Sequence, residues 1–215
     1  MPIQSLNGDE LVRLYGPWAG RTPTDALRLL EGYPGPWWVA GGWAIEAFTG
    51  AAREHGDLDL EIPRGDLPLL RRHLAGRLDV WTATDGALKP LLPDDGTHTT
   101  PEAVLPVGCG QVWLRPSGQE PWEYDVLLMD GEHQCWQFKR DRRISLPIHN
   151  AVWSHDEVSY LRPEVQLLLK AHGLRPKDQR DFDVAAPLLD SQSSTWLRNS
   201  LELAHPGHPW SVALA

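Results

Sequence analysis

Two aspartates, Asp57 and Asp59, are separated by a single residue in the segment 55–60. In an extended chain, side chains two residues apart project from the same face of the strand, so these carboxylates would lie side by side. Neighbouring carboxylates repel each other and raise each other's pKa, and a bound cation relieves that repulsion. The pattern predicts a metal site, and surface salt bridges are the alternative.

A third acid stands at the head of the apolar run 126–128, where Asp125 is preferred and Glu123 is the rival. An aspartate beside a buried run is costly unless it is paired or bound to a cation. Carboxylate oxygens suit Mg²⁺, which commonly takes a few carboxylates together with phosphate oxygens. We therefore expect Asp57, Asp59 and Asp125 to hold one or two Mg²⁺ ions. Such ions would neutralise a triphosphate and align it for attack, and the third carboxylate could take the proton of an attacking hydroxyl.

Two glycines, Gly41 and Gly42, separate an apolar strand at 37–40 from a helix at 43–50. A glycine turn before a helix offers backbone N–H groups and the positive end of the helix dipole, which favours a phosphate. A plain tight turn is the alternative, and no Walker A sequence follows. Trp43, in the first helical turn, is either a packing residue or part of the pocket.

Three basic residues complete the predicted nucleotide-binding set. Arg53 and His55 lie just before the aspartate pair and could contact phosphate or orient a carboxylate. Lys170 ends an apolar helix face, where it either binds phosphate or extends to solvent. For Arg53 and His55, a surface salt bridge or turn role is the competing interpretation.

The elements that must position these residues form an α+β pattern. Residues 1–150 are predicted to form a small mixed sheet backed by helices, and residues 151–215 a helical domain. Residues 85–108 are rich in proline, glycine and small polar residues, which predicts a long loop. The remaining expected elements are helices at 5–16, 23–32, 66–75, 162–172, 176–189 and 194–205, and strands at 57–62, 78–84, 111–115, 122–129 and 134–139.

The composition is that of an ordinary globular protein. The 215 residues carry a net charge of −9 and no block of lysine and arginine, so an extended nucleic-acid-binding face is not expected. Cys109 and Cys135 lack the spacing of a zinc site and are expected to be free thiols. Without a signal-peptide start or a long apolar run, the chain is predicted to be cytoplasmic.

Gly41-Gly42-Trp43, followed by Asp57-x-Asp59 and a downstream Asp125, resembles the nucleotidyltransferase superfamily of polymerase β type. Within it, the strings at 41–46, 53–60 and 161–183 are similar to the aminoglycoside 2″-adenylyltransferase-like branch. The resemblance covers residues 37–62, 122–129 and 161–183. The superfamily commonly has serine after the glycines, and tryptophan replaces it here, as in that branch.

This resemblance implies a catalytic site in a cleft between a mixed-sheet domain and a helical domain. It implies that Asp57 and Asp59 bind Mg²⁺ and that Asp125 completes the site as a candidate general base. The implied reaction moves a nucleoside monophosphate, AMP from ATP, to a hydroxyl and releases pyrophosphate.

The implied acceptor is a small molecule of the aminoglycoside antibiotic type, which would make the protein an antibiotic-resistance enzyme. The acidic net charge agrees with a polycationic acceptor. Two alternatives stay open: a toxin-like or regulatory nucleotidyltransferase acting on tRNA or protein, and an inactive nucleotide-binding module. Residues 85–121 match nothing in the family, and we hypothesise that acceptor choice resides there.

Overall fold

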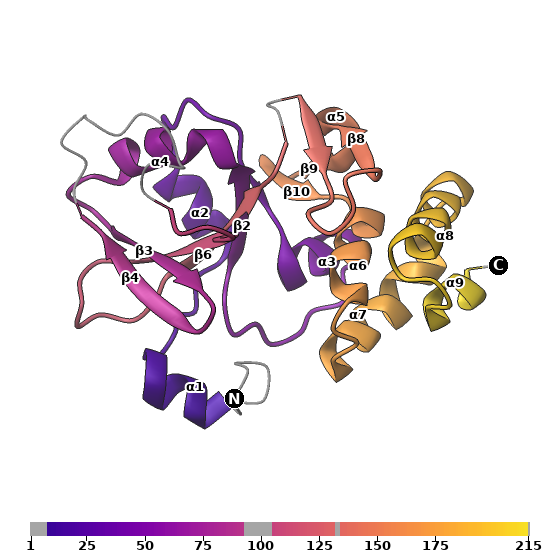
Figure 1. The fold of residues 1–215 in the computed structure, drawn as a ribbon, viewed down its shortest axis with the longest axis horizontal. Coiled ribbons are helices and arrows are strands. Elements are labelled where there is room, and N and C mark those ends of the chain that lie inside the picture. The colour runs from indigo at the N-terminus through magenta and orange to yellow at the C-terminus, as the bar shows by residue number, and fades with distance from the viewer. Residues whose placement is uncertain (1–7, 93–104, 132–133, 215) are drawn as a thin grey trace. The chain divides into compact units, whose positions relative to one another are not determined.

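The structure is a computed structural model that describes residues 8–92, 105–131 and 134–214 (Figure 1). Its contacts divide the chain into two compact units, each assembled from segments that are distant in sequence. The first unit comprises Met1–Trp37 and His55–Met129, and the second Trp38–Glu54 and Asp130–Ala215.

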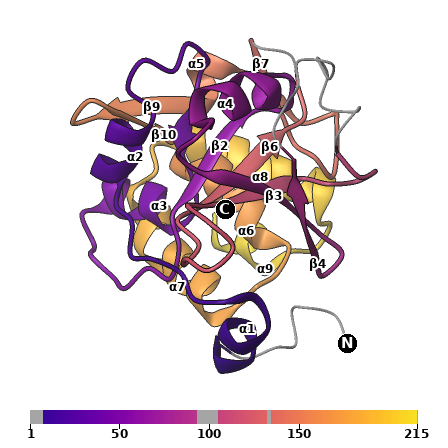
Figure 2. The ribbon, with the colours of Figure 1, turned by 90° about the vertical axis from the view of Figure 1, so that its left-hand side faces the viewer.

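The first unit contains strands in the order β4-β3-β5-β6-β2. Their bounds are Asp59–Pro63 for β2, Asp79–Thr84 for β3, Ala87–Leu91 for β4, Gln111–Arg115 for β5 and Tyr124–Met129 for β6. Strands β2 and β6 are parallel, whereas the β6–β5, β5–β3 and β3–β4 pairs are antiparallel. The unit therefore contains mixed strand pairing, and the two strands predicted at 111–115 and 122–129 are present as the antiparallel pair β5 and β6. Figure 2 shows β2, β3, β4 and β6 of this unit.

Helices α1 (Gly8–Tyr15), α2 (Pro23–Leu29) and α4 (Leu67–Leu74) complete this unit, with a short 3₁₀ turn at Arg64–Asp66 before α4. Apolar side chains of the strands and helices form its core. The fully buried members include Leu58, Leu60, Ile62, Leu67, Leu70, Leu74, Val112, Leu114 and Val126.

The second unit places the short strand β1 (Trp38–Val39) parallel to β10 (Val158–Leu161), which pairs antiparallel with β9 (Val152–His155). Helix α3 (Gly41–Thr49) follows β1 directly. A two-stranded sheet of β7 (Cys135–Gln137) and β8 (Ser145–Pro147), helix α5 (Ile148–Ala151) and four C-terminal helices complete the unit. These helices are α6 (Pro163–Ala171), α7 (Pro176–Ala185), α8 (Ser191–Ala204) and α9 (Pro209–Ala213).

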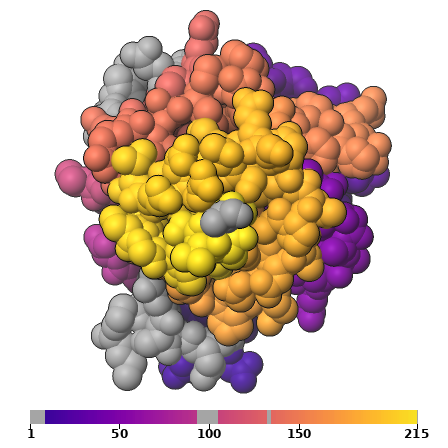
Figure 3. Space-filling model, turned by 90° about the vertical axis from the view of Figure 1, so that its right-hand side faces the viewer, coloured from indigo at the N-terminus to yellow at the C-terminus, as the bar shows by residue number. Residues whose placement is uncertain are grey.

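Aromatic stacking joins the C-terminal helices within the second unit. The rings of Phe182 on α7 and Trp210 on α9 are stacked with centroids 4.3 Å apart. The indole N–H of Trp210 donates to Gln179 Oε1 at 2.8 Å. Figure 3 shows the α8 and α9 residues, in yellow, gathered beside the orange residues of α6 and α7. The predicted α+β fold with a helical C-terminal region is confirmed.

Two hairpins differ from the sequence prediction. Residues 87–91 form strand β4 where a loop was expected, after a turn in which Asp85 and Gly86 both have positive φ. Strands β9 and β10 lie in a stretch expected to contain no strand, and their turn places Asp156 and Glu157 at positive φ. Residues 93–104, part of the segment hypothesised to choose the acceptor, lie outside the described residues. Cys109 and Cys135 are free thiols, as expected.

Candidate active site

Strands β2 and β6 bring two of the three predicted aspartates, Asp59 and Asp125, side by side in the first unit's sheet. Asp59 is the register partner of Asp125, and the Asp125 N–H donates to Leu58 O at 3.0 Å. Register partners on parallel strands project to the same face. Asp57 lies two residues before the start of β2 and, like Asp59, is partly exposed. Asp59 and Asp125 are therefore neighbours on adjacent strands, and together with Asp57, two residues before Asp59 in the chain, they are called the carboxylate row.

Glu123, the rival for the third position, forms an ion pair with Arg21 from the segment that precedes α2. The hydrogen bond that Arg21 donates to Glu123 is the main reason that the pKa of Arg21 is raised above its ordinary value. By contrast, Asp125 is 7% exposed and lies beside Asp59. The geometry favours Asp125 over Glu123 as the companion of the Asp57–Asp59 pair.

The donor chemistry of this row fits magnesium, since all three side chains offer carboxylate oxygens. Among residues 8–92, 105–131 and 134–214, no three or more His, Cys, Asp or Glu side chains are grouped so that they could hold a metal ion by themselves. Proteins usually bind Mg²⁺ through one or two carboxylates together with substrate phosphates and water, rather than through an all-protein cage.

An aromatic cluster occupies the same face of the sheet as the carboxylate row. Trp113 on β5 is the register partner of Asp125, and its ring contacts Trp18 and Trp122 at centroid distances of 5.0 and 5.2 Å. The guanidinium carbon of Arg115 lies 4.2 Å from the Trp81 ring and 4.0 Å from the Trp122 ring. The abundance of tryptophan signals such a cluster, but its location depends on strand register that the sequence does not show.

The glycine turn lies in the second unit, where helix α3 begins at Gly41. Gly41 has φ +67°, in the left-handed region that favours glycine, and both Gly41 and Gly42 are buried. The residue before the helix, Ala40, provides no side-chain cap. Instead, the Gly41 N–H donates to Gln166 Oε1 on α6 at 2.7 Å. Trp43, also in the first turn, is partly exposed.

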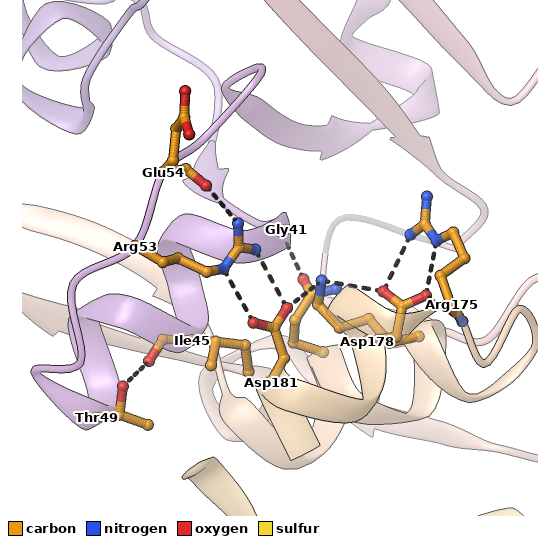
Figure 4. A network of polar contacts seen from close by, with 10 residues as sticks. Gly41, Ile45, Thr49, Arg53, Glu54, Arg175, Asp178 and Asp181 are labelled. Atoms are coloured by element: carbon orange, nitrogen blue, oxygen red, sulfur yellow. Dashed lines mark hydrogen bonds and ion pairs between the residues drawn. The ribbon is translucent and has the colours of Figure 1, made fainter. Parts of the chain in front are cut away.

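Lys170 and Arg53 are joined by an acidic residue that the predicted set did not include (Figure 4). Asp181 on α7 accepts from Arg53 Nε and Nη2 at 3.0 and 3.2 Å. Lys170 Nζ lies 2.8 Å from Asp181 Oδ2 and 3.6 Å from Asp178 Oδ1. Asp178 in turn accepts from Arg175 at 2.7 and 3.1 Å. The five side chains form a continuous chain of alternating charge.

This network is largely buried, because Lys170, Asp178 and Asp181 are at most 7% exposed. Burial by itself raises the pKa of Asp178, but the hydrogen bonds from Arg175 and the charge of Lys170 outweigh it and lower that pKa. Asp178, Asp181 and Gln166 are not among the site residues predicted from the sequence. His55 is partly exposed and precedes Asp57 in the first unit.

No helix in the described part of the chain is long and apolar enough to cross a membrane.

Comparison with known proteins gives a family match and matches to solved structures. Residues 24–85, which contain the glycine turn and the Asp57–Asp59 pair, match the model of the aminoglycoside-2″-adenylyltransferase family. No curated protein sequence matches the chain.

The first similar structure is the lincomycin-bound lincosamide antibiotic adenylyltransferase LnuA, with a TM-score of 0.51, 14% identity, and coverage of 80% of this chain and 99% of that one. The second is ANT(2″)-Ia in complex with adenylyl-2″-tobramycin, with a TM-score of 0.52, 13% identity, and coverage of 82% and 93%. The chain thus has the fold of these nucleotidyltransferases, and its predicted resemblance to the aminoglycoside-2″-adenylyltransferase family is confirmed over residues 24–85.

Proposed function

We propose that this protein is a magnesium-dependent nucleotidyltransferase that moves AMP from ATP to a hydroxyl of a small-molecule acceptor. The observation that carries the proposal is the register of β2 and β6, in which Asp59, two residues after Asp57, is the partner of Asp125. The family match and the fold shared with two antibiotic adenylyltransferases support it.

In this proposal, Asp57 and Asp59 hold Mg²⁺, with Asp125 as the third carboxylate. The ion supplies charge neutralisation and alignment of the triphosphate. Asp125 accepts the proton of the acceptor hydroxyl, whose oxygen forms a new bond to the α-phosphorus. The bond from the α-phosphorus to the bridging oxygen breaks, and pyrophosphate leaves with that electron pair.

The glycine turn and the basic residues are proposed to bind the nucleotide. The first turn of α3 offers backbone N–H groups to phosphate, because the first N–H groups of a helix lack intrahelical acceptors. Gly41, Gly42 and Trp43 form this turn, and Arg53 and Lys170 belong to the charged network beside it. His55 is proposed to orient a carboxylate or phosphate next to Asp57.

For the acceptor we propose an aminoglycoside-type antibiotic, since the family match carries that name. The carboxylate row and the faces of Trp113 and Trp18 favour a cationic ring compound, because aromatic faces and carboxylates both attract ammonium groups.

The proposal is tested by incubating the protein with magnesium and each nucleoside triphosphate, with aminoglycosides, lincosamides and bulk tRNA as separate acceptors, and measuring pyrophosphate release. We expect release with ATP and an aminoglycoside. Asp57→Asn and Asp59→Asn should each lower the rate by about 100-fold or more, because several kcal/mol of charge stabilisation are lost. Asp9→Asn, on an exposed face of α1, is the matched control.

Full activity in both aspartate variants would refute the metal assignment. Activity only with tRNA would replace the small-molecule proposal with the toxin-like alternative. Nucleotide binding without release of pyrophosphate in any arm would favour the inactive binding module.

A further inference from the structure

Helix α6 holds both ends of the α3 segment through two residues that are four positions apart. Gln166 and Lys170 share one face of α6, since residues at this spacing lie above one another on a helix. Both are buried, with exposures of 4% and 7%. Gln166 accepts from the Gly41 N–H at the start of α3, and Lys170 reaches Arg53 beyond its end through Asp181 (Figure 4).

The far end of the segment is also tied back to α3 itself. The Arg53 backbone N–H donates to Glu46 Oε2 at 3.0 Å, and Gly50 ends the helix in the left-handed conformation. The glycine turn is thus one terminus of an element whose other terminus is fixed by a buried ion-pair network.

The contact with Gln166 also determines which N–H groups remain for a phosphate. The Gly41 N–H is used by a buried amide oxygen at 2.7 Å. The next N–H group of the first turn, that of Gly42, has no intrahelical acceptor, because it lies among the first four of the helix. A phosphate at this turn would be bound from Gly42 onward.

Gln166 is neutral, and its neutrality has an electrostatic consequence. A carboxylate at this position could still accept the Gly41 N–H and would lie at the positive end of the α3 dipole. It would also repel an incoming triphosphate. The neighbouring network pairs its three cations (Arg53, Lys170 and Arg175) with the carboxylates of Asp178 and Asp181.

We propose that Gln166 is a positioning residue for the nucleotide: its amide oxygen fixes the glycine turn while leaving the charge there favourable to a triphosphate. This inference rests on the proposed function, because it assigns the turn to the nucleotide. It adds that the Gly41 N–H is used by Gln166 to hold the turn, so that phosphate is bound by the N–H groups from Gly42 onward.

The test compares Gln166→Glu, Gln166→Met and the exposed control Gln192→Glu, on α8 of the same unit. For each, the Kd for magnesium–ATP without acceptor is measured by calorimetry, together with the KM for ATP, the KM for the acceptor and the Tm. The calorimetric Kd gives a readout that does not depend on turnover.

Gln166→Glu should raise the Kd and KM for ATP about tenfold or more while leaving the acceptor KM near its wild-type value. This increase should shrink as the pH is lowered and the introduced carboxyl takes up a proton. Gln166→Met, which removes the acceptor of a buried N–H, should lower the Tm and weaken ATP binding together. Gln192→Glu should change neither the Tm nor the affinity for ATP.

Wild-type ATP affinity in Gln166→Glu would overturn the inference, as would a loss of ATP affinity that does not vary with pH. If wild-type protein binds ATP but transfers nothing to any acceptor, the proposed transfer fails while the role of Gln166 is still decided by the calorimetric Kd. If wild-type protein binds no nucleotide, both proposals are wrong.

Discussion

Asp181 is the residue on which the buried network of the second unit depends, and Asp181→Asn tests that dependence. Its side chain accepts two bonds from Arg53 at 3.0 and 3.2 Å and lies 2.8 Å from Lys170 Nζ. Only 2% of Asp181 is exposed. The substitution keeps the size of the side chain and removes its charge, so Lys170 loses its nearest counter-charge inside the protein.

The expected loss in the free energy of unfolding depends on how deeply the two cations, Lys170 and Arg53, are buried. Removing one partner of a buried ion pair typically costs about 3–5 kcal/mol, because the other charge is left uncompensated. Here Lys170 keeps Asp178 at 3.6 Å and the Arg53 side chain is 28% exposed, so the lower end applies. We expect a loss of roughly 3 kcal/mol in the free energy of unfolding. For a chain of this length, that loss corresponds to a fall in Tm of about 6–12 °C.

Thermal unfolding followed by circular dichroism measures this change. Asp183→Asn is the matched control, because Asp183 is on the same helix but exposed, with a hydrogen bond from Gln179. The control should stay within about 0.5 kcal/mol of wild type. If Asp181→Asn melts at the wild-type temperature, the network does not stabilise the second unit and our account of it is wrong.

Three further predictions concern other parts of the chain. Neutral His208 donates from Nε2 to Ala171 O and accepts the Trp210 N–H at Nδ1, and burial lowers its pKa below 6.5. The unfolded chain therefore binds more protons, so the free energy of unfolding should fall as the pH drops below about 6.5. Urea titrations at a series of pH values measure this fall, and a His208→Gln variant whose free energy of unfolding falls as steeply with pH as that of wild type would contradict the prediction. Gly41→Ala should cost about 1–2 kcal/mol in a thermal melt, because φ is +67°; an unchanged Tm would show that the turn relaxes. Glu123→Gln should retain pyrophosphate release while Asp125→Asn lowers it by about 10²–10⁴-fold; the reverse order would make Glu123 the third acid.

The strands that carry Asp59 and Asp125 could be predicted from local patterns. The alternation around Asp57 and Asp59 and the apolar run after Asp125 indicate strands, and both strands are present. The parallel register that places Asp59 beside Asp125 is not a local property, and it had to come from the structure.

The missed hairpins have local explanations. Strand β4 contains Pro90, which lacks a backbone donor and is tolerated mainly in edge strands, and β4 is at the edge of the first unit's strand order. Because of this proline, the sequence of the strand resembles that of a loop. Strands β9 and β10 have four residues each, and their turn uses Asp156 and Glu157 at positive φ, where glycine would have been the usual signal.

The partners of Lys170 and Gly41 could not be predicted, because their contacts join distant parts of the chain. Gln166 and Gly41 are 125 positions apart, and Arg53 and Asp181 are 128 apart. A lysine at the end of an apolar helix suggests either phosphate binding or extension to solvent. The structure shows a buried lysine beside two aspartates, so any role of Lys170 toward a nucleotide must be compatible with those partners.

The most direct test of the central claim is to follow which phosphorus of ATP reaches the acceptor. The protein is incubated with magnesium, an aminoglycoside, and ATP radiolabelled at either the α- or the γ-phosphorus, and the acceptor is then separated from the nucleotide. We expect label from the α-phosphorus to appear on the acceptor with the wild-type protein and to be absent with Asp59→Asn. Transfer of γ-label, or undiminished transfer of α-label by Asp59→Asn, would contradict it.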